Sequence, residues 1–185
     1  MKKIALIIGH NPKSQGAVRV TDGMTEFAFY KKLAEDLKAL APDQYVILQR
    51  SPEGGYAKEI DRVYAEANAL RVSGTVELHF NAAAAASASG TEVLTSGTRN
   101  SMILCNLLQD HMTTTLKLKS RGVKQVTKQQ RGGRSLWVGS SPAALIEPFF
   151  GSNRNDCEVI DRNYDKFVKS LHDACTTFLK RPDIK

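Results

Sequence analysis

The sequence contains few cysteines, no long apolar run and no internal repeat, and each of these features excludes a class of protein. Its three cysteines, Cys105, Cys157 and Cys175, show no paired spacing, so neither a disulfide framework nor a zinc site built from cysteine is indicated. No stretch approaches the roughly twenty apolar residues that a membrane-spanning helix needs. A metal site in this chain would therefore have to use histidine and carboxylate ligands.

The composition is that of an ordinary globular domain with a basic surface. At 185 residues, of which 42% are hydrophobic, the chain can bury one substantial core, and we expect residues 1–185 to form a single domain. The formal charge of +7 attracts polyanions such as nucleic acid, an anionic membrane face or an acidic polymer. Basic residues are spread along the chain, with some concentration between Lys117 and Arg134, which favours a solvated basic face over a nucleic-acid groove.

The amino-terminal residues resemble the start of a secretory signal but lack its long apolar region and its cleavage site. Met1-Lys2-Lys3 precedes an apolar run of only five residues, and no small-residue cleavage site follows. We interpret this run as the first strand and expect the protein to be made in the cytoplasm without a signal peptide.

Strand and helix patterns alternate along the chain, which predicts an α/β fold: a twisted, mostly parallel or mixed sheet of about six strands with helices on both faces. We expect strands at Ile4–Ile8, Tyr45–Leu48, Val76–Asn81, Thr91–Thr95, Leu136–Val138 and Ala143–Ile146, and a short one within Arg121–Arg134. We expect helices at about Thr25–Leu40, Tyr56–Leu70, Ser101–Leu116 and Cys157–Leu179. The alanine- and serine-rich run Ala82–Ser89 is expected to be a loop.

Three apolar runs stop at residues that can bind metal or carry protons. His10 closes the first run, His79 lies near the end of Val76–Asn81, and Glu147 follows Ala143–Ile146. Ligands of open α/β sheets collect outside the carboxyl ends of the strands, so we expect these side chains to meet in one crevice. With Glu26 at the start of the first helix, two histidines and a carboxylate can hold a metal and a second carboxylate remains for proton transfer. That set is typical of a zinc hydrolase.

Each of these residues taken alone has a simpler explanation. His79 could face solvent or hydrogen-bond the backbone, and His10 could be an ordinary loop residue. The dipole and unpaired amides at a helix start favour a carboxylate such as Glu26 without any metal. The prediction therefore depends on the combination.

Of the four residues, Glu147 has the sequence context that indicates a role in the site most specifically. It lies between Ala143–Ile146 and Pro148-Phe149-Phe150, so burial should raise its pKa unless a cation is close. A carboxylate with its pKa near neutrality suits a general base that takes a proton from water and delivers it to a leaving amine. The alternative is a buried ion pair with Arg131 or Arg134.

These motifs, in this order, resemble the zinc-dependent N-acetylmuramoyl-L-alanine amidases of the amidase-3 type, found in bacterial cell-wall hydrolases and phage endolysins. The resemblance covers nearly the whole chain. It rests on Ile8-Gly9-His10 with Gly16-Ala17, Thr25-Glu26, Val46–Arg50, Arg62 with Ala67-Asn68, Leu78–Ala82, Gly90-Thr91-Glu92, Arg121–Lys124, Pro142–Glu147 and Phe150–Asn153.

The resemblance implies a function and a role for each site residue. His10, Glu26 and His79 would be zinc (Zn2+) ligands and Glu147 the catalytic acid/base, in an enzyme that cleaves the amide between the lactyl group of N-acetylmuramic acid and the first L-alanine of the peptide stem. We consider Arg131, Arg134 and Asn81 as the residues that stabilise the oxyanion or bind the substrate. His111 and His172 lie on helices that also supply a core stripe, and we assign them no role in the site.

Peptidoglycan is thus the expected substrate, with an added electrostatic attraction to the anionic envelope. We expect a monomeric, phage-type lysin without a separate wall-binding module, which acts at the cell wall or periplasm after release during phage lysis and has no nucleic-acid partner. Two alternatives stay open. One is another zinc hydrolase of the same architecture, such as a carboxypeptidase or an amidohydrolase; the other is a non-catalytic wall-binding or nucleic-acid-binding protein.

Overall fold

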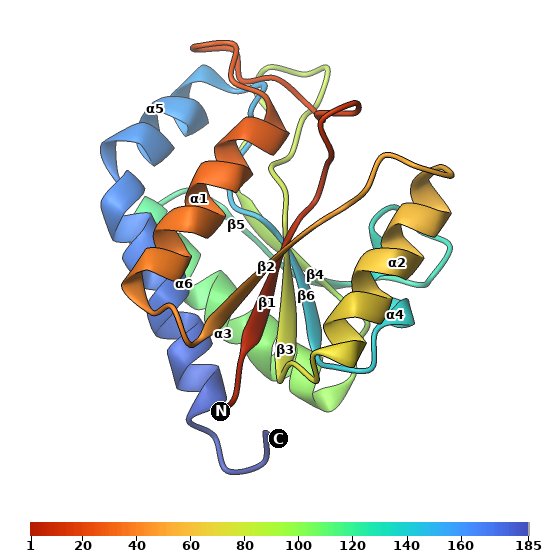
Figure 1. The fold of residues 1–185 in the computed structure, drawn as a ribbon. Helices are drawn as coiled ribbons and strands as arrows, with labels where there is room; N and C mark the ends of the chain where they lie inside the picture. The colour runs from red at the N-terminus through yellow and green to blue at the C-terminus, as the bar shows by residue number, and fades with distance from the viewer. Residues whose placement is uncertain (185) are drawn as a thin grey trace.

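A six-stranded mixed sheet forms the centre of the molecule, and helices cover both of its faces (Figure 1). The computed structural model describes residues 1–184. The strands are β1 (Ile4–Ile8), β2 (Tyr45–Gln49), β3 (Gly74–Leu78), β4 (Thr91–Thr95), β5 (Ser120–Gln125) and β6 (Ala143–Glu147). The helices are α1 (Glu26–Leu40), α2 (Tyr56–Ala69), α3 (Arg99–Leu116), α4 (Gly133–Val138), α5 (Arg154–Arg162) and α6 (Tyr164–Leu179). The predicted fold class is confirmed.

The strand order places three of the expected site residues at one edge of the sheet. The order is β2-β1-β3-β6-β4-β5, and β1, β3 and β6 run parallel to one another. Ile8 pairs with Leu78, and Leu78 pairs with Ile146, so the three strands end level with one another. β4 runs antiparallel to β6, with Glu92 opposite Glu147. The start of β4 therefore lies at the edge where β6 ends.

Alternation along the strands divides the core into two layers. Figure 1 shows α1, α3, α5 and α6 on one face of the sheet and α2 and α4 on the other. Ile4, Leu6 and Ile8 pack with the first group of helices, whereas Ala5 and Ile7 pack against α2. Among residues 1–184, no helix combines the length and the apolar character needed to cross a bilayer.

Two predicted elements are wrong. Residues 136–138, predicted as a strand, belong to α4, in which Leu136 is buried and Trp137 is 45% exposed. So short an apolar run carries too little periodicity to separate strand from helix. The predicted helix Cys157–Leu179 is two helices, because Asn163, with φ −116° and ψ 14°, interrupts it between α5 and α6.

Candidate metal centre

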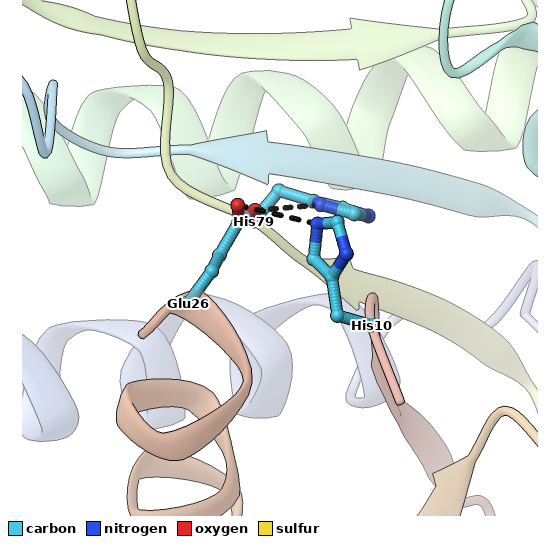
Figure 2. A group of neighbouring side chains, drawn as sticks. All are labelled: His10, Glu26 and His79. Carbon is cyan, nitrogen blue, oxygen red and sulfur yellow. Dashed lines mark hydrogen bonds and ion pairs between the residues drawn. The ribbon is translucent and has the colours of Figure 1, made fainter. Parts of the chain in front are cut away.

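Two histidines and a glutamate from distant parts of the chain meet at the carboxyl ends of β1 and β3 (Figure 2). His10 follows β1, His79 follows β3, and Glu26 is the first residue of α1. One ligand atom from each of the three lies within 4.8 Å of the other two. Glu26 contacts both rings, with Oε2 at 3.2 Å from His10 Nε2 and Oε1 at 2.8 Å from His79 Nδ1.

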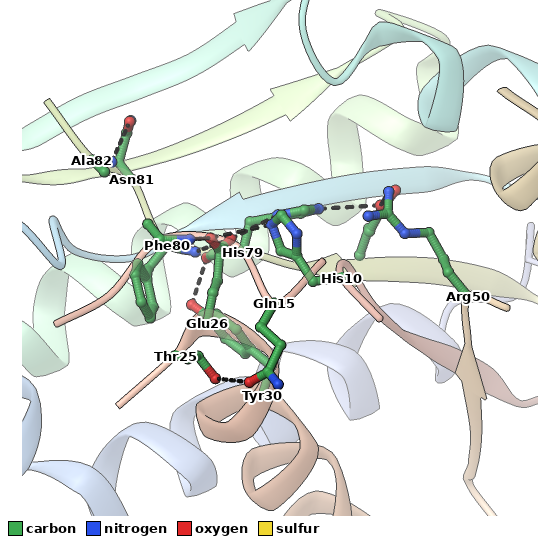
Figure 3. Close-up of polar contacts among 12 residues, drawn as sticks. His10, Gln15, Thr25, Glu26, Tyr30, Arg50, His79, Phe80, Asn81 and Ala82 are labelled. Carbon is green, nitrogen blue, oxygen red and sulfur yellow. Dashed lines mark hydrogen bonds and ion pairs between the residues drawn. The ribbon is translucent and has the colours of Figure 1, made fainter. Parts of the chain in front are cut away.

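The local structure fixes Glu26 in this position. Thr25 caps α1 by accepting a hydrogen bond from the Ala28 amide at 3.2 Å, so the helix begins where its first side chain faces the sheet edge. Glu26 also accepts hydrogen bonds from the amides of Ala17 and Phe80, each at 3.1 Å. Figure 3 shows this arrangement, with Glu26 directed from the helix towards His79.

Two glycines allow the three side chains to approach each other. Gly16 has φ +79°, and a Cβ there would lie 2.6 Å from Glu26 Oε2 and 2.7 Å from His10 Nε2. A Cβ on Gly9 would lie 2.2 Å from His79 Nε2. All three distances are shorter than any ordinary contact, so the site requires glycine at both positions.

His79 contacts a carboxylate through each ring nitrogen. Nδ1 lies 2.8 Å from Glu26 and Nε2 lies 3.1 Å from Glu77. Burial alone would lower the pKa of His79, but the hydrogen bonds to Glu26 and Glu77 outweigh it and raise the pKa to about 9. Because an ionised carboxylate only accepts hydrogen bonds, Nε2 must carry a proton towards Glu77. By the same argument Nδ1 carries a proton towards Glu26, and this proton, on the side of Glu26 and His10, is the one that a metal would displace.

Glu77 itself lies in a buried polar network behind His79. Its side chain is 1% exposed and accepts a hydrogen bond from the Tyr64 hydroxyl at 3.1 Å. Arg50 Nη1 lies 3.9 Å from Glu77, and Arg50 Nε lies 3.9 Å from Glu59. Burial would raise the pKa of Glu77, but the hydrogen bond to His79 and the positive charges keep it lowered. Carboxylates of this kind commonly fix the orientation of metal-binding histidines.

Glu147, at the end of β6, lies beside this centre and is 6% exposed. Burial is the main cause that raises its pKa to about 7, and a hydrogen bond with Glu92 adds to it. Asn81 donates a hydrogen bond to each of the two carboxylates, at 2.5 Å to Glu147 and 2.9 Å to Glu92. Glu147 therefore has the environment of a group that exchanges protons near neutral pH.

Glu92 takes the opposite ionisation state from Glu147. Burial would raise its pKa, but hydrogen bonds from Lys124 and from Arg121, the latter at 2.7 Å, lower it to about 2. Sequence reasoning gave no role to Glu92 or to Glu77. A signal existed for both, since each is an acid within a short strand of otherwise apolar or small polar residues.

The structure separates the three candidates for the oxyanion or the substrate. Arg134 forms two hydrogen bonds to Asp61, at 2.6 and 3.0 Å, and Asn81 is committed to the two carboxylates. Arg131 makes no ion pair within 4.0 Å among residues 1–184. It lines two cavities, of about 570 and 370 Å³, and Glu147 lines both as well. The predicted alternative, a close ion pair of Glu147 with Arg131 or Arg134, is absent from the described residues.

The donor set fits a divalent transition metal. Two imidazoles and a carboxylate, with one position left for water, are the ligands of catalytic zinc sites. His10 Nδ1 is buried without a hydrogen-bond partner in residues 1–184, so the ring is not committed to another role in the fold. The remaining histidines lie elsewhere: His111 is on α3, and His172 on α6 contacts the Tyr45 hydroxyl at 3.1 Å.

Comparison with known proteins identifies the family. The family model described as N-acetylmuramoyl-L-alanine amidase, Amidase_3, matches residues 4–177. No curated protein matches the sequence. The catalytic domain of CwlV from Bacillus (Paenibacillus) polymyxa var. colistinus has a TM-score of 0.80 at 20% identity, with 100% of both chains covered. The N-acetylmuramoyl-L-alanine amidase of Clostridium difficile 630 gives 0.80 at 19%, with 98% of both chains covered.

A third solved structure is the catalytic domain of the CD27L endolysin, described as targeting Clostridia difficile. It has a TM-score of 0.79 at 20% identity, with 96% of this chain and 98% of that one covered. At such identities these structures establish the shared fold, while the family match covers most of the sequence. The chain therefore belongs to the amidase-3 family of N-acetylmuramoyl-L-alanine amidases, enzymes that degrade peptidoglycan.

Proposed function

We propose that His10, Glu26 and His79 bind zinc and that Glu147 transfers protons in hydrolysis of the amide between N-acetylmuramic acid and L-alanine. The observation that supports the proposal is the convergence of the three ligand atoms at one sheet edge, in a cavity that His10, His79 and Glu147 line together. A bound zinc supplies a Lewis acid that polarises the scissile carbonyl and lowers the pKa of water.

Glu147 performs the two proton transfers of the reaction. Its carboxylate accepts a proton from the attacking water, and the same proton then passes to the nitrogen of L-alanine as the carbon–nitrogen bond breaks. Hydrolysis leaves a carboxylate on the lactyl group and a free amine on the peptide. Asn81 orients the carboxylate through its hydrogen bond to Oε2.

The enzyme is, in this proposal, a lysin that reaches the cell wall of a host. CD27L, whose catalytic domain shares the fold, is described as an endolysin. The charge of +7 favours adsorption to an anionic envelope, which concentrates the enzyme at its substrate. Residues 1–185 act as one catalytic domain.

Product analysis tests the proposal. The chain with added zinc is incubated with purified peptidoglycan, and the products are separated by mass. An amidase releases intact stem peptides with a free amino-terminal alanine and leaves the glycan uncut. Shortened stems would instead indicate a carboxypeptidase, and no cleavage with or without zinc would indicate a non-catalytic wall-binding protein.

Two variants separate the assigned roles. Glu147→Gln should keep zinc bound and remove turnover, because only the proton carrier is lost. His79→Ala should lose the metal, measured by atomic absorption after dialysis. Normal turnover by the Glu147 variant would contradict its role.

A further inference from the structure

The larger of the two cavities beside Glu147 has a cationic wall that the hydrolytic step does not use. This cavity, of about 570 Å³, extends from His10 and His79 to the loop 128–132. Four cationic side chains line it, and Glu147 is the one acidic residue among its lining residues. The cations are Arg50, Lys128, Arg131 and Arg134.

Two of these four cations are already neutralised by close carboxylates. Arg50 lies between Glu59 and Glu77, and Arg134 is bound to Asp61. Lys128 and Arg131 have no carboxylate within 4.0 Å in residues 1–184, although each attracts a carboxylate from a longer distance, Lys128 that of Asp61 and Arg131 that of Glu147. In the described residues the cavity therefore has two positive charges without a close ion-pair partner.

Hydrogen bonds stabilise the loop that carries these two cations. The Thr127 amide donates to Gln130 Oε1 at 2.6 Å, and the Gln130 amide donates to the Thr127 carbonyl at 3.1 Å. The Trp137 indole, on α4, donates to the Val126 carbonyl at 2.9 Å just before the loop. These hydrogen bonds hold the backbone next to Lys128 and Arg131.

The two halves of the proposed substrate differ in charge. The glycan around the scissile amide is neutral, because the lactyl carboxyl is consumed in that amide, whereas the stem peptide carries free carboxylates. The scissile bond must lie where His10, His79 and Glu147 share a cavity, and of the two cavities that Glu147 lines, this is the one with Lys128 in its wall. Two cations without a close ion-pair partner there favour the anionic half of the substrate.

We propose that Lys128 and Arg131 form a subsite that binds a free carboxylate of the stem peptide, so that the enzyme selects acidic stems over amidated ones. This inference rests on the proposed function of the cavity as the substrate site. It assigns the peptide, and not the glycan, to the loop 128–132.

A binding experiment tests the subsite without requiring turnover. The probes are two synthetic tripeptides of the stem sequence, one with a free α-carboxyl on its second residue and one with a carboxamide there. Calorimetry with chelator-treated protein should show about tenfold tighter binding of the acidic peptide. The double variant Lys128→Gln/Arg131→Gln should lose this preference while its melting temperature stays unchanged.

The matched control removes two charges elsewhere. Lys31 and Lys166 are exposed on α1 and α6 and make no ion pair in residues 1–184, so Lys31→Gln/Lys166→Gln should keep the preference. Equal binding of the two peptides by the unmodified chain, or a preference that survives in the Lys128/Arg131 variant, would overturn the subsite. In hydrolysis, Lys128→Gln should raise KM for the acidic substrate with little change in kcat.

Failure of the proposed function gives a different result. A chain that does not cleave peptidoglycan with zinc contradicts the amidase assignment whatever the peptides do. A chain that cleaves acidic and amidated stems equally well contradicts only the subsite.

Discussion

Glu77→Gln tests whether the carboxylate behind His79 prepares the ring for a metal. The substitution keeps the size of the side chain and removes its charge. The Tyr64 hydroxyl can still donate to the amide oxygen, and Arg50 keeps Glu59 at 3.9 Å. What is lost is the ionised acceptor that lies 3.1 Å from His79 Nε2 and holds the proton there.

Two effects of opposite sign determine the change in zinc affinity. Loss of an orienting carboxylate typically costs a metal site about 10- to 100-fold in affinity, or about 1.4–2.7 kcal/mol. Removal of the Glu77 charge also lowers the pKa of His79 from its value of about 9, which eases the proton loss that metal binding requires. The lower pKa of His79 offsets part of the cost of losing the orienting carboxylate. We therefore expect zinc affinity to fall by about tenfold at neutral pH, near the lower end of the 10- to 100-fold range.

Competition with a chromophoric chelator measures the zinc affinity, and urea unfolding with and without zinc measures the linked stability. A tenfold rise in the dissociation constant should reduce the stabilisation by excess zinc by about 1.4 kcal/mol. Glu66→Gln, an exposed change on the same helix as Tyr64, is the matched control and should leave both quantities unchanged. Zinc affinity within twofold of the unmodified chain, or a stability loss equal with and without zinc, would refute the reasoning.

Three further perturbations address the rest of the site. Gly16→Ala should abolish zinc binding in a folded protein, because the added Cβ would lie 2.6 Å from Glu26 Oε2; retained stoichiometric zinc after dialysis would contradict this. Glu92→Gln should move the acidic limb of the pH–rate profile to lower pH, because Glu92 raises the pKa of Glu147, and Glu147, as the proposed base, must be deprotonated to act; an unmoved or raised limb would count against the coupling. Added salt should slow digestion of whole walls but not of soluble muropeptides, since screening weakens adsorption of the basic protein to the anionic wall. If salt slowed both reactions equally, the charge would not act through adsorption.

Strand ends are the part of the site that the sequence predicts well. His10, His79 and Glu147 each follow an apolar run, and parallel strands bring their carboxyl ends to one edge whatever their exact order. Glu26 could be placed because Thr25 is a good cap and the apolar periodicity of α1 begins just after it. The prediction that these side chains meet needs no knowledge of loop structure.

The supporting carboxylates depend on tertiary structure and could not be placed in the same way. Whether Glu77 faces solvent or a buried arginine depends on α2, which brings Tyr64 over β3. The role of Glu92 depends on the antiparallel direction of β4, which sets it opposite Glu147. No local pattern distinguishes an antiparallel strand from a parallel one when both of its faces are buried, and β4 is buried throughout.

Charge balance explains why these buried acids are compatible with a cation site. The protonated ring of His79 lies between the carboxylates of Glu26 and Glu77, and its pKa of about 9 reflects that it balances part of their charge. A divalent ion held by His10, Glu26 and His79 would take the place of the Nδ1 proton and would add one net positive charge to a centre otherwise dominated by carboxylates. The pair of acids therefore favours the metal for the same reason that it favours the proton, and apparent zinc affinity should fall as the pH decreases below the pKa of His79.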